Sequence, residues 1–547
     1  MAEGKSVNIA SHLPEMARKL PDSPAVIVQD GFRYEQCSFR KLDMMSDAIA
    51  HSLERIGIKR GTRAVLMVKP SVDFFAITFA LFKIGAVPVM IDPGIGIKNL
   101  RKCIDAAKPK AFIGIPKAHI ARIIFGWGRI SIKVLVTAGK RFGWGGPTVK
   151  GLLSSKKHKR YNIANTQPDE TAAILFTSGN TGISKGVVYP HRIFDSQVKY
   201  QQTVYKIKPG EKDLATFPLF ALFGPALGMT AIIPDMDAAR PVQADPRKII
   251  HAIKKFNATN MFASPALINK ISRHGVRKKI KLPSLKRVIS AGAPASTQSL
   301  RLFSSMLAPG VQVFTPYGAT EALPVCNIGS DEIISRTNIL TEKGKGNCIG
   351  RPVPGMDLKI IRITDTPIKS WSNSLVLPEG EIGEIAVKGP VVTREYYRRP
   401  KQTALAKIPE KNKGFYHRMG DVGYKDKDGK VWFCGRKSHR VTTTEETLFT
   451  LPCEAIYNTH PDVFRTALVG VKNSSKVVPV LCVELEKNVP GNKESRIRKE
   501  LLSLGRSYPH TANINKVMFH PAFPVDIRHN AKIFRERLAV WAGRELP

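Results

Sequence analysis

Residues 176–186, FTSGNTGISKG, have the composition of a loop that holds a polyphosphate. Small Gly, Ser and Thr residues let several backbone N–H groups and hydroxyls point at one spot, and Lys185 adds a positive charge. Because Ser184 precedes Lys185 and Gly186 follows it, the segment lacks the Gly-Lys-[Ser/Thr] order of a Walker loop. The apolar runs AAILF and GVVY on either side predict that the loop joins two short strands. An exposed linker has a similar composition, so other motifs must decide between the two interpretations.

A hydroxyl and a carboxylate stand side by side in TPYGATE, residues 315–321. Thr320 can donate a hydrogen bond to a phosphate, and Glu321 can hold the Mg²⁺ that accompanies it. Taken alone, the motif is equally compatible with an ordinary turn.

Two later stretches carry groups suited to a ribose and to a phosphate under attack. HRMGDVGY, residues 417–424, places Asp421 in a Gly-flanked turn before the strand VWFCG, and Arg436 follows that strand. A carboxylate can accept from both ribose hydroxyls, and Arg adds charge-assisted hydrogen bonds. HNAKIFRERL, residues 529–538, places Lys532 at the start of the last helix. The alternatives are a turn-forming Asp and a solvated Lys.

Short apolar segments alternate with helix-like segments through about residue 430, which predicts an α/β fold with mostly parallel sheets flanked by helices. The predicted strands include RAVLMV (63–68), VPVMID (87–92), AFIGI (111–115), KVLVTA (133–138) and KRVISAG (286–292). Near Gly435 the pattern changes to a compact α+β one. We therefore predict a large domain over residues 1–434 and a small one over residues 435–547.

The charge of the chain is strongly positive: 547 residues include 85 Lys and Arg against 44 Asp and Glu, a formal net charge of +41. The basic residues are spread along the whole chain and accompany no zinc-finger, RNA-recognition or heptad pattern, which argues against a nucleic-acid-binding protein. Seven cysteines without a C-x-x-C pair, and an N-terminus without a signal-peptide pattern, predict a cytoplasmic protein.

Residues 74–91 approach the length of a membrane span, but Lys83, Gly85 and Pro88 interrupt them. This pattern predicts a buried helix followed by a buried strand.

Taken together and in this order, the motifs resemble the adenylate-forming superfamily of acyl-CoA synthetases, luciferases and nonribosomal-peptide adenylation domains. The likeness runs over nearly the whole chain and includes LFKIGAVPVMIDP at residues 81–93 and SAGAP at residues 290–294. It implies a large AMP-binding domain with an acyl pocket over residues 1–434, and a small mobile domain over residues 435–547 that carries the catalytic lysine. It further implies that ATP and Mg²⁺ are required and that the first product is an acyl-adenylate.

The resemblance also implies roles for single residues. The phosphate loop would bind the ATP phosphates, the SAGAP and TPYGATE segments would frame the adenine and contact phosphate, Asp421 and Arg436 would hold the ribose, and Glu321 would hold Mg²⁺. Lys532 would bridge the substrate carboxylate and the α-phosphate. The implied catalytic residues are Thr177, Lys185, Glu321 and Lys532. The implied ATP-binding residues are Thr177, Ser178, Gly179, Asn180, Thr181, Gly182, Lys185, Gly292, Ala293, Pro294, Tyr317, Gly318, Thr320, Asp421, Arg436 and Lys532.

Two departures from the common pattern bear on what accepts the acyl group. In FPLFALFG, residues 217–224, Ala221 stands where many acyl-CoA ligases have His, which leaves room beside the reactive carbon. After Arg436 most relatives have an acidic hinge residue and a Gly-containing loop, whereas here Ser438 stands at the hinge and no Gly follows for a long stretch. Without that Gly, close backbone approach to the thiol arm of CoA is harder to build. The expected substrate contacts are Phe220, Ala221, Phe223 and Gly224.

Within the superfamily the chain closely resembles the OleC-type β-lactone synthetases of bacterial long-chain olefin biosynthesis. That resemblance implies a long-chain 2-alkyl-3-hydroxy acid whose own hydroxyl displaces AMP from the adenylate and closes a cis-β-lactone. Such a tethered hydroxyl can reach an effective concentration on the order of 10⁵ M. The resemblance also implies assembly with an olefin-pathway α/β-hydrolase and reductase. The net charge separately suggests peripheral contact with an anionic membrane.

Two other functions are weighed against this one. A long-chain fatty acyl-CoA ligase would turn over plain fatty acids only with CoA. A non-catalytic nucleic-acid-binding protein would bind DNA or RNA and exchange no pyrophosphate into ATP. The general base for the β-hydroxyl is left unassigned, because each histidine near a motif also suits a structural role. These histidines are His191, His417, His439 and His529.

Overall fold

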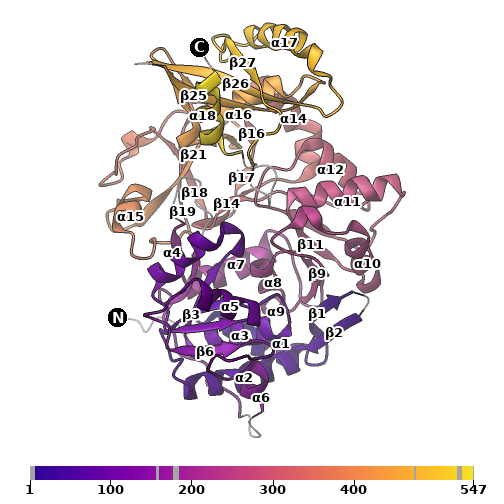
Figure 1. Ribbon diagram of the computed structural model, residues 1–547, viewed down its shortest axis with the longest axis vertical. Helices are drawn as coiled ribbons and strands as arrows, with labels where there is room; N and C mark the ends of the chain where they lie inside the picture. Colours follow the sequence, from indigo (N-terminus) through magenta and orange to yellow (C-terminus); the bar gives the residue numbers. More distant parts are fainter. Residues whose placement is uncertain are drawn as a thin grey trace.

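The structure is a computed structural model that describes residues 7–31, 33–154, 159–176, 184–473, 476–525 and 533–545. Its first large sheet has six strands in the order β6-β5-β3-β4-β7-β8 (Figure 1). All neighbours in it are parallel except β7 and β8, which form an antiparallel pair at one edge. The strands are β3 (Arg63–Met67), β4 (Val87–Ile91), β5 (Ala111–Gly114), β6 (Val134–Thr137), β7 (Thr171–Phe176) and β8 (Gly186–Pro190).

A second sheet has seven strands in the order β13-β12-β11-β9-β10-β1-β2, again parallel except for the edge pair of β1 and β2. The α/β prediction with mostly parallel sheets is therefore confirmed. The strands are β1 (Pro24–Asp30), β2 (Arg33–Ser38), β9 (Lys212–Ala215), β10 (Thr230–Ile233), β11 (Asn260–Ala263), β12 (Arg287–Ser290) and β13 (Val313–Phe314).

The helices that accompany these sheets follow from apolar spacing and capping. In α10 the buried isoleucines 249, 250 and 253 lie on one face, the Asp245 side chain caps the first turn, and Asn257 ends the helix in the left-handed conformation. The principal helices of this part are α1 (His12–Lys19), α2 (Phe39–Arg55), α3 (Val72–Ile84), α4 (Ile97–Ala107), α5 (Pro116–Ile124), α6 (Val149–Leu153), α7 (His191–Thr203), α10 (Pro246–Phe256), α11 (Pro265–Arg277) and α12 (Thr297–Ser304).

Two antiparallel sheets follow, which the alternating pattern did not single out. One contains β16 (Asn347–Cys348), β22 (Val431–Arg436), β21 (Gly414–Lys425), β19 (Gly383–Lys388) and β18 (Asp357–Ile361), with β20 (Lys407–Glu410) paired to β21. The other contains β14 (Tyr317–Ala319), β15 (Ala322–Asn327) and β17 (Arg351–Pro352). The predicted turn at Asp421 is wrong: Asp421 lies inside β21, because buried Met419 and Val422 keep that stretch in the sheet.

The C-terminal part is small and α+β, and Figure 1 shows it in yellow at one end of the long axis. Its sheet has the order β25-β26-β27, formed by β25 (Val463–Asn473), β26 (Lys476–Leu485) and β27 (Lys516–Phe519). Its helices are α16 (Thr450–Tyr457), α17 (Glu494–Arg506) and α18 (Arg535–Glu545). The division proposed between residues 434 and 435 falls within β22.

The last helix begins at Arg535, so the predicted start at Lys532 is wrong. The physical reason is local pairing: Ile533 forms a β-bridge with Val525, and the amide of Phe534 donates to the carbonyl of Pro524 across 2.8 Å. Backbone held in this way cannot join the helix.

The apolar stretch at residues 74–91 is, as predicted, a buried helix and a buried strand, α3 and β4. Among the residues that the structure describes, no helix is both long and apolar enough to cross a bilayer. Lys83 is 1% exposed, and its Nζ lies 2.5 Å from Oδ1 of both Asp43 and Asp47 on α2. This buried ion cluster fastens α3 to α2.

Replacing Lys83 with Met should therefore destabilise the fold by about 3–5 kcal/mol, because removing one partner leaves buried carboxylates without their cation. Urea unfolding followed by tryptophan fluorescence measures the loss. The control is Lys199→Met, which removes an exposed lysine paired with Asp195 and should cost under about 1 kcal/mol. Equal stabilities for the two variants would contradict the assignment.

Candidate active site

Strands β7 and β8 lie at one edge of the six-stranded sheet and flank the predicted phosphate loop, residues 176–186. They pair antiparallel with Phe176 opposite Gly186, as the predicted strand-loop-strand arrangement requires. The loop residues Thr177, Ser178, Gly179, Asn180, Thr181 and Gly182 lie outside the described residues. Lys185 is described, and its Nζ stands 4.8 Å from the centre of the Tyr396 ring. A cation over an aromatic face is a favourable arrangement.

The turn that carries Thr320 and Glu321 joins β14 to β15, as predicted. It is held from β8, because the Tyr189 hydroxyl donates to the carbonyl of Thr320. The Tyr396 hydroxyl donates to Glu321 Oε1 across 2.7 Å. Burial and the nearby Glu321 carboxylate raise the pKa of Tyr396, so this hydroxyl keeps its proton and remains a donor.

Residues 392–397, which we call the connecting segment, tie the phosphate-loop strand to this turn. On one side the amide of Tyr397 donates to the carbonyl of Gly186 across 2.7 Å, and Tyr396 bridges Val187. On the other side both the amide and the hydroxyl of Thr393 donate to the carbonyl of Glu321, across 2.9 and 3.0 Å. The connecting segment therefore sets the spacing between Gly186, where β8 begins, and Glu321. Sequence reasoning missed it, since TREYY carries no glycine or catalytic pattern.

The predicted ribose ligands meet across one strand pair. Asp421 of β21 stands opposite Arg436 of β22, and Arg436 Nη1 lies 2.8 Å from Asp421 Oδ1. The Tyr317 hydroxyl donates to the other oxygen of Asp421, Oδ2, across 2.6 Å. Burial raises the pKa of Asp421, and the Arg436 charge and the Tyr317 hydrogen bond oppose that effect. Arg436 is 40% exposed, so its guanidinium can also reach a ligand.

Two glycines shape the predicted adenine site, which also includes Ala293 and Pro294 in the turn after β12. Gly292 has φ of 98°, a conformation that L residues with side chains rarely adopt. A Cβ on Gly318 would lie 2.5 Å from the carbonyl oxygen of Ala322, so only glycine lets β14 approach β15 this closely. Tyr317, Gly318 and Thr320 are all half-buried and come from the same small sheet.

The predicted substrate residues lie in two short helices after β9, namely α8 (Pro218–Ala221) and α9 (Phe223–Ala226). Phe220 stacks on Phe262 with ring centres 3.8 Å apart, and Phe223 lies 6.0 Å from Phe220. Ala221 is completely buried, so the room predicted beside it is not open to solvent here. Gly224 packs against β10, where an added Cβ would lie 3.1 Å from the Ala231 Cβ.

A buried Lys–His pair stands behind the connecting segment. His417 was considered only as a histidine near a motif, and no sequence pattern pointed to Lys407. Lys407 of β20 faces His417 of β21 in the antiparallel register. Lys407 Nζ donates to the carbonyl of Thr393, and His417 Nδ1 lies 3.1 Å from the carbonyl of Ala406. Burial lowers the pKa of Lys407 to about 7, although the Glu321 carboxylate acts in the opposite direction. Burial and the Lys407 charge lower the pKa of His417.

The histidines differ in how well they suit proton transfer. His191 is fully buried, its Nδ1 accepts from the amide of Ile9 across 3.3 Å, and burial lowers its pKa to about 4. His417 is also buried, so the surroundings of both histidines suit a structural role better than proton transfer. His439 lies just after Arg436 and is 3.6 Å from Glu536 of α18. His529, like Lys532, lies outside the described residues, and the general base stays unassigned.

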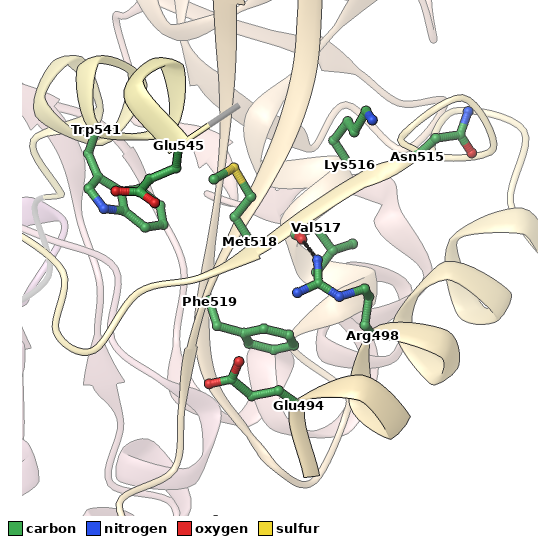
Figure 2. Close-up of a pocket in the computed structure, with 9 residues that line it drawn as sticks. All are labelled: Glu494, Arg498, Asn515, Lys516, Val517, Met518, Phe519, Trp541 and Glu545. Carbon is green, nitrogen blue, oxygen red and sulfur yellow. Dashed lines mark hydrogen bonds between the residues drawn. The ribbon is translucent and has the colours of Figure 1, made fainter. Parts of the chain in front are cut away.

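A surface groove of about 480 Å³ lies elsewhere, between β27, α17 and α18. Figure 2 shows that the Arg498 guanidinium donates to the carbonyl of Val517 inside it, and Arg498 also stands 5.1 Å from the centre of the Phe519 ring. No residue of the sequence motifs lines this groove. Its lining residues are Glu494, Arg498, Asn515, Lys516, Val517, Met518, Phe519, Trp541 and Glu545.

Comparison with known proteins gives a consistent picture. A family profile described as AMP-binding enzyme matches residues 13–397. The chain is 46% identical to an olefin beta-lactone synthetase of Xanthomonas campestris pv. campestris, over 98% of both chains. It is 47% identical to an olefin beta-lactone synthetase of Stenotrophomonas maltophilia, again over 98% of both chains.

Solved structures with lower identity share the fold. The amide bond synthetase McbA from Marinactinospora thermotolerans has a TM-score of 0.79 at 21% identity, with 97% of this chain and 99% of that chain covered. The O-succinylbenzoate coenzyme A synthetase from Bacillus subtilis, in complex with AMP, has a TM-score of 0.74 at 20% identity, with 96% and 97% covered.

The hydrogen bond between Tyr396 and Glu321 leads to the first prediction for this site. Tyr396→Phe removes the donor at 2.7 Å and leaves the ring under Lys185 in place. The Mg²⁺ concentration needed for half-maximal pyrophosphate exchange into ATP should rise by about 3- to 10-fold, the net contribution of roughly one typical intramolecular hydrogen bond. Tyr397→Phe, one residue along, is the matched control. An unchanged Mg²⁺ requirement in Tyr396→Phe would contradict the positioning role.

The lowered pKa of Lys407 gives a second prediction, on stability against pH. In the unfolded chain this lysine titrates near 10.5 and in the folded protein near 7. Between these values unfolding takes up a proton, so raising the pH stabilises the wild type. Relative to Lys407→Met, the wild type should gain up to about 1.4 kcal/mol per pH unit between pH 7.5 and 9.5. Urea titrations at both pH values measure the gain, with Lys359→Met, which changes a half-exposed lysine paired with Asp357, as control. Parallel pH dependences would contradict it.

Proposed function

This chain belongs to the AMP-binding enzyme family, and from that premise we propose that it converts a long-chain 2-alkyl-3-hydroxy acid and ATP into a cis-β-lactone, AMP and pyrophosphate. The chain is an ATP-dependent, AMP-forming enzyme. The observation that carries the proposal is the likeness to two olefin beta-lactone synthetases along 98% of the chain. The same fold occurs in enzymes with other acyl acceptors, so the fold alone does not choose among them.

In the first half-reaction the acid's carboxylate oxygen bonds to the α-phosphorus of ATP, and the bond to pyrophosphate breaks. We assign Asp421 and Arg436 to the ribose, and Gly292, Pro294 and Tyr317 to the adenine. Lys185 and Lys532, with the amides of the phosphate loop, would stabilise the negative charge that develops on phosphate oxygens. The ion pair of 2.8 Å between Arg436 and Asp421 supports this, because it presets the position of the carboxylate.

Glu321 suits a Mg²⁺ ligand. Nucleotide-bound Mg²⁺ is held by one or two carboxylates together with phosphates and water. Among the described residues no group of three or more His, Cys, Asp or Glu could hold a metal by itself. Glu321, a single carboxylate held by the hydroxyl of Tyr396, fits the coordination of nucleotide-bound Mg²⁺ rather than an all-protein metal site. When bound, the ion would neutralise charge on the transferring phosphates.

In the second half-reaction the β-hydroxyl oxygen bonds to the acyl carbon, AMP leaves, and the hydroxyl proton passes to a base. Tethering makes this attack fast without an external thiol. The region after the hinge supports this choice. Where most relatives have a Gly-containing loop that lines the pantetheine path, this chain has the hairpin of β23 (Val441–Thr442) and β24 (Thr447–Leu448). The hairpin closes on Thr443, whose hydroxyl accepts from the amides of Glu445 and Glu446. This closed, acidic turn offers little to a thiol arm or an anionic CoA.

The wider partners belong to the same proposal. A β-lactone is a reactive product, so delivery to an olefin-pathway α/β-hydrolase, in an assembly that also holds a reductase, would limit its loss to water. A long-chain acid partitions into lipid, and peripheral contact with an anionic membrane would bring the cytoplasmic enzyme to it.

The test supplies ATP, Mg²⁺ and a synthetic syn 2-alkyl-3-hydroxy acid, with and without CoA, and identifies products by NMR. Lactone, AMP and pyrophosphate should form in equal amounts, and CoA should change neither rate nor product. The matched 2-alkyl acid without the hydroxyl should support pyrophosphate exchange into ATP but give no lactone. An acyl-CoA as main product, or no turnover until CoA is added, would overturn the proposal in favour of a fatty acyl-CoA ligase.

A further inference from the structure

A group of large apolar side chains is exposed on and beside α5, and we call it the α5 face. Ile120, Ile123 and Ile124 follow the i, i+3, i+4 spacing of one helical face. Phe125 adjoins them, and Ile130 in the following turn is 90% exposed. Folded monomers seldom expose so many large apolar residues together without a binding role.

The α5 face is held in place by packing beneath it. Trp127 is buried, its amide donates to the carbonyl of Arg122 across 3.0 Å, and its ring stacks beside Phe125. A sixth apolar side chain, Phe142, packs on Trp144, which in turn stacks on His119 of α5 with ring centres 5.0 Å apart. The exposed residues therefore form a fixed surface. Its neighbour β6 is the edge strand of its sheet, and Figure 1 shows α5 in the indigo part of the molecule, away from the yellow C-terminal part.

The stretch of sequence that contains the α5 face carries charge of one sign only. Residues 106–168 contain 13 Lys and Arg and no Asp or Glu. Exposed basic residues of this stretch include Lys117, Arg129 and Lys133. One acidic group from outside it, Asp105, accepts from the amide of Gly128 across 3.2 Å, and Arg101 is its ion-pair partner at 3.6 Å. The surface thus combines exposed isoleucines with an excess of positive charge.

We propose that the α5 face docks this protein on an anionic lipid bilayer, with the isoleucines inserted at the level of the acyl-chain boundary and the basic residues on the lipid headgroups. An amphipathic surface of apolar residues bordered by Lys and Arg binds membranes through burial of the apolar side chains together with electrostatic attraction to anionic lipids. A second copy of the chain is a poorer occupant, because two strongly basic faces would repel each other. The α5 face would thus be the site of the membrane contact suggested under the proposed function. This inference rests on the proposed function only for the lipid character of the substrate.

The test is flotation of the full-length protein with vesicles of phosphatidylethanolamine and phosphatidylglycerol. The triple variant I120S/I123S/I124S should lower the vesicle-bound to free ratio by at least about tenfold, since three inserted isoleucines are lost. The matched control is I339S/L340S, which changes two apolar residues of similar exposure elsewhere, 54% and 41%, and should bind as the wild type does. The charge variant K117Q/R129Q/K133Q should also lose at least about tenfold at low salt.

Two further readouts make the result decisive. Ile130→Trp should show a blue-shifted emission when anionic vesicles are added and no shift with phosphatidylcholine vesicles. Pyrophosphate exchange into ATP and the thermal midpoint of the triple variant should match the wild type, which separates failure of docking from failure of the fold or of the proposed reaction. Absent vesicle binding, or binding that the triple variant keeps, overturns the inference. Self-association that the triple variant abolishes, without vesicle binding, assigns the face to a second copy instead.

Discussion

The connecting segment is the constraint on which the rest of the candidate site depends. Its backbone reaches the strand that leaves the phosphate loop, at Gly186, and the turn that carries the predicted metal ligand, at Glu321. The three parts come from distant stretches of sequence, yet they are joined by backbone hydrogen bonds, which are directional and leave little freedom of distance. The phosphates and their metal ion must be contacted together, so a fixed spacing has chemical value.

What lies behind the connecting segment explains how it keeps its shape. Lys407 donates to the carbonyl of Thr393 from a fully buried position, where burial itself lowers the pKa of the lysine. A buried donor whose charge is weakened costs less to enclose than a permanent cation, yet it still satisfies the carbonyl. The register that sets Lys407 against His417 belongs to the same sheet that sets Asp421 against Arg436. The lysine that braces the connecting segment and the predicted ribose ligands therefore come from one antiparallel sheet, whereas the turn that carries Glu321 belongs to the neighbouring sheet of β14, β15 and β17.

Much of the fold and part of the site could be predicted from the sequence, because local signals carry them. Apolar runs located β3 to β6, and the strand pair around the phosphate loop followed from AAILF and GVVY. The turn predicted at Asp421 failed because flanking glycines suggested chain reversal, whereas burial of Met419 and Val422 decides the backbone there. Tyr396 and Lys407 were missed because their roles arise from contacts between segments far apart in sequence. The roles of the ligand-binding residues themselves remain predictions. The choice of acyl acceptor depends on individual loops, which the fold alone does not specify.

The position of the positive charge also changes its interpretation. The basic residues are spread along the chain, but the acidic residues are not: residues 106–168 contain 13 Lys and Arg and no Asp or Glu. Elsewhere many cations are used inside the protein, as in the buried pairs of Arg287 with Glu211 and Arg418 with Glu384. Arg141 donates to the carbonyl of Gly146 and Arg122 lies over the Phe112 ring, but the exposed Lys117, Arg129 and Lys133 beside the isoleucines can act on what lies outside the chain. Since a uniform charge would favour any anion equally, the proposed contact with a lipid surface rather than a soluble polyanion rests on this coincidence of charge and apolar surface.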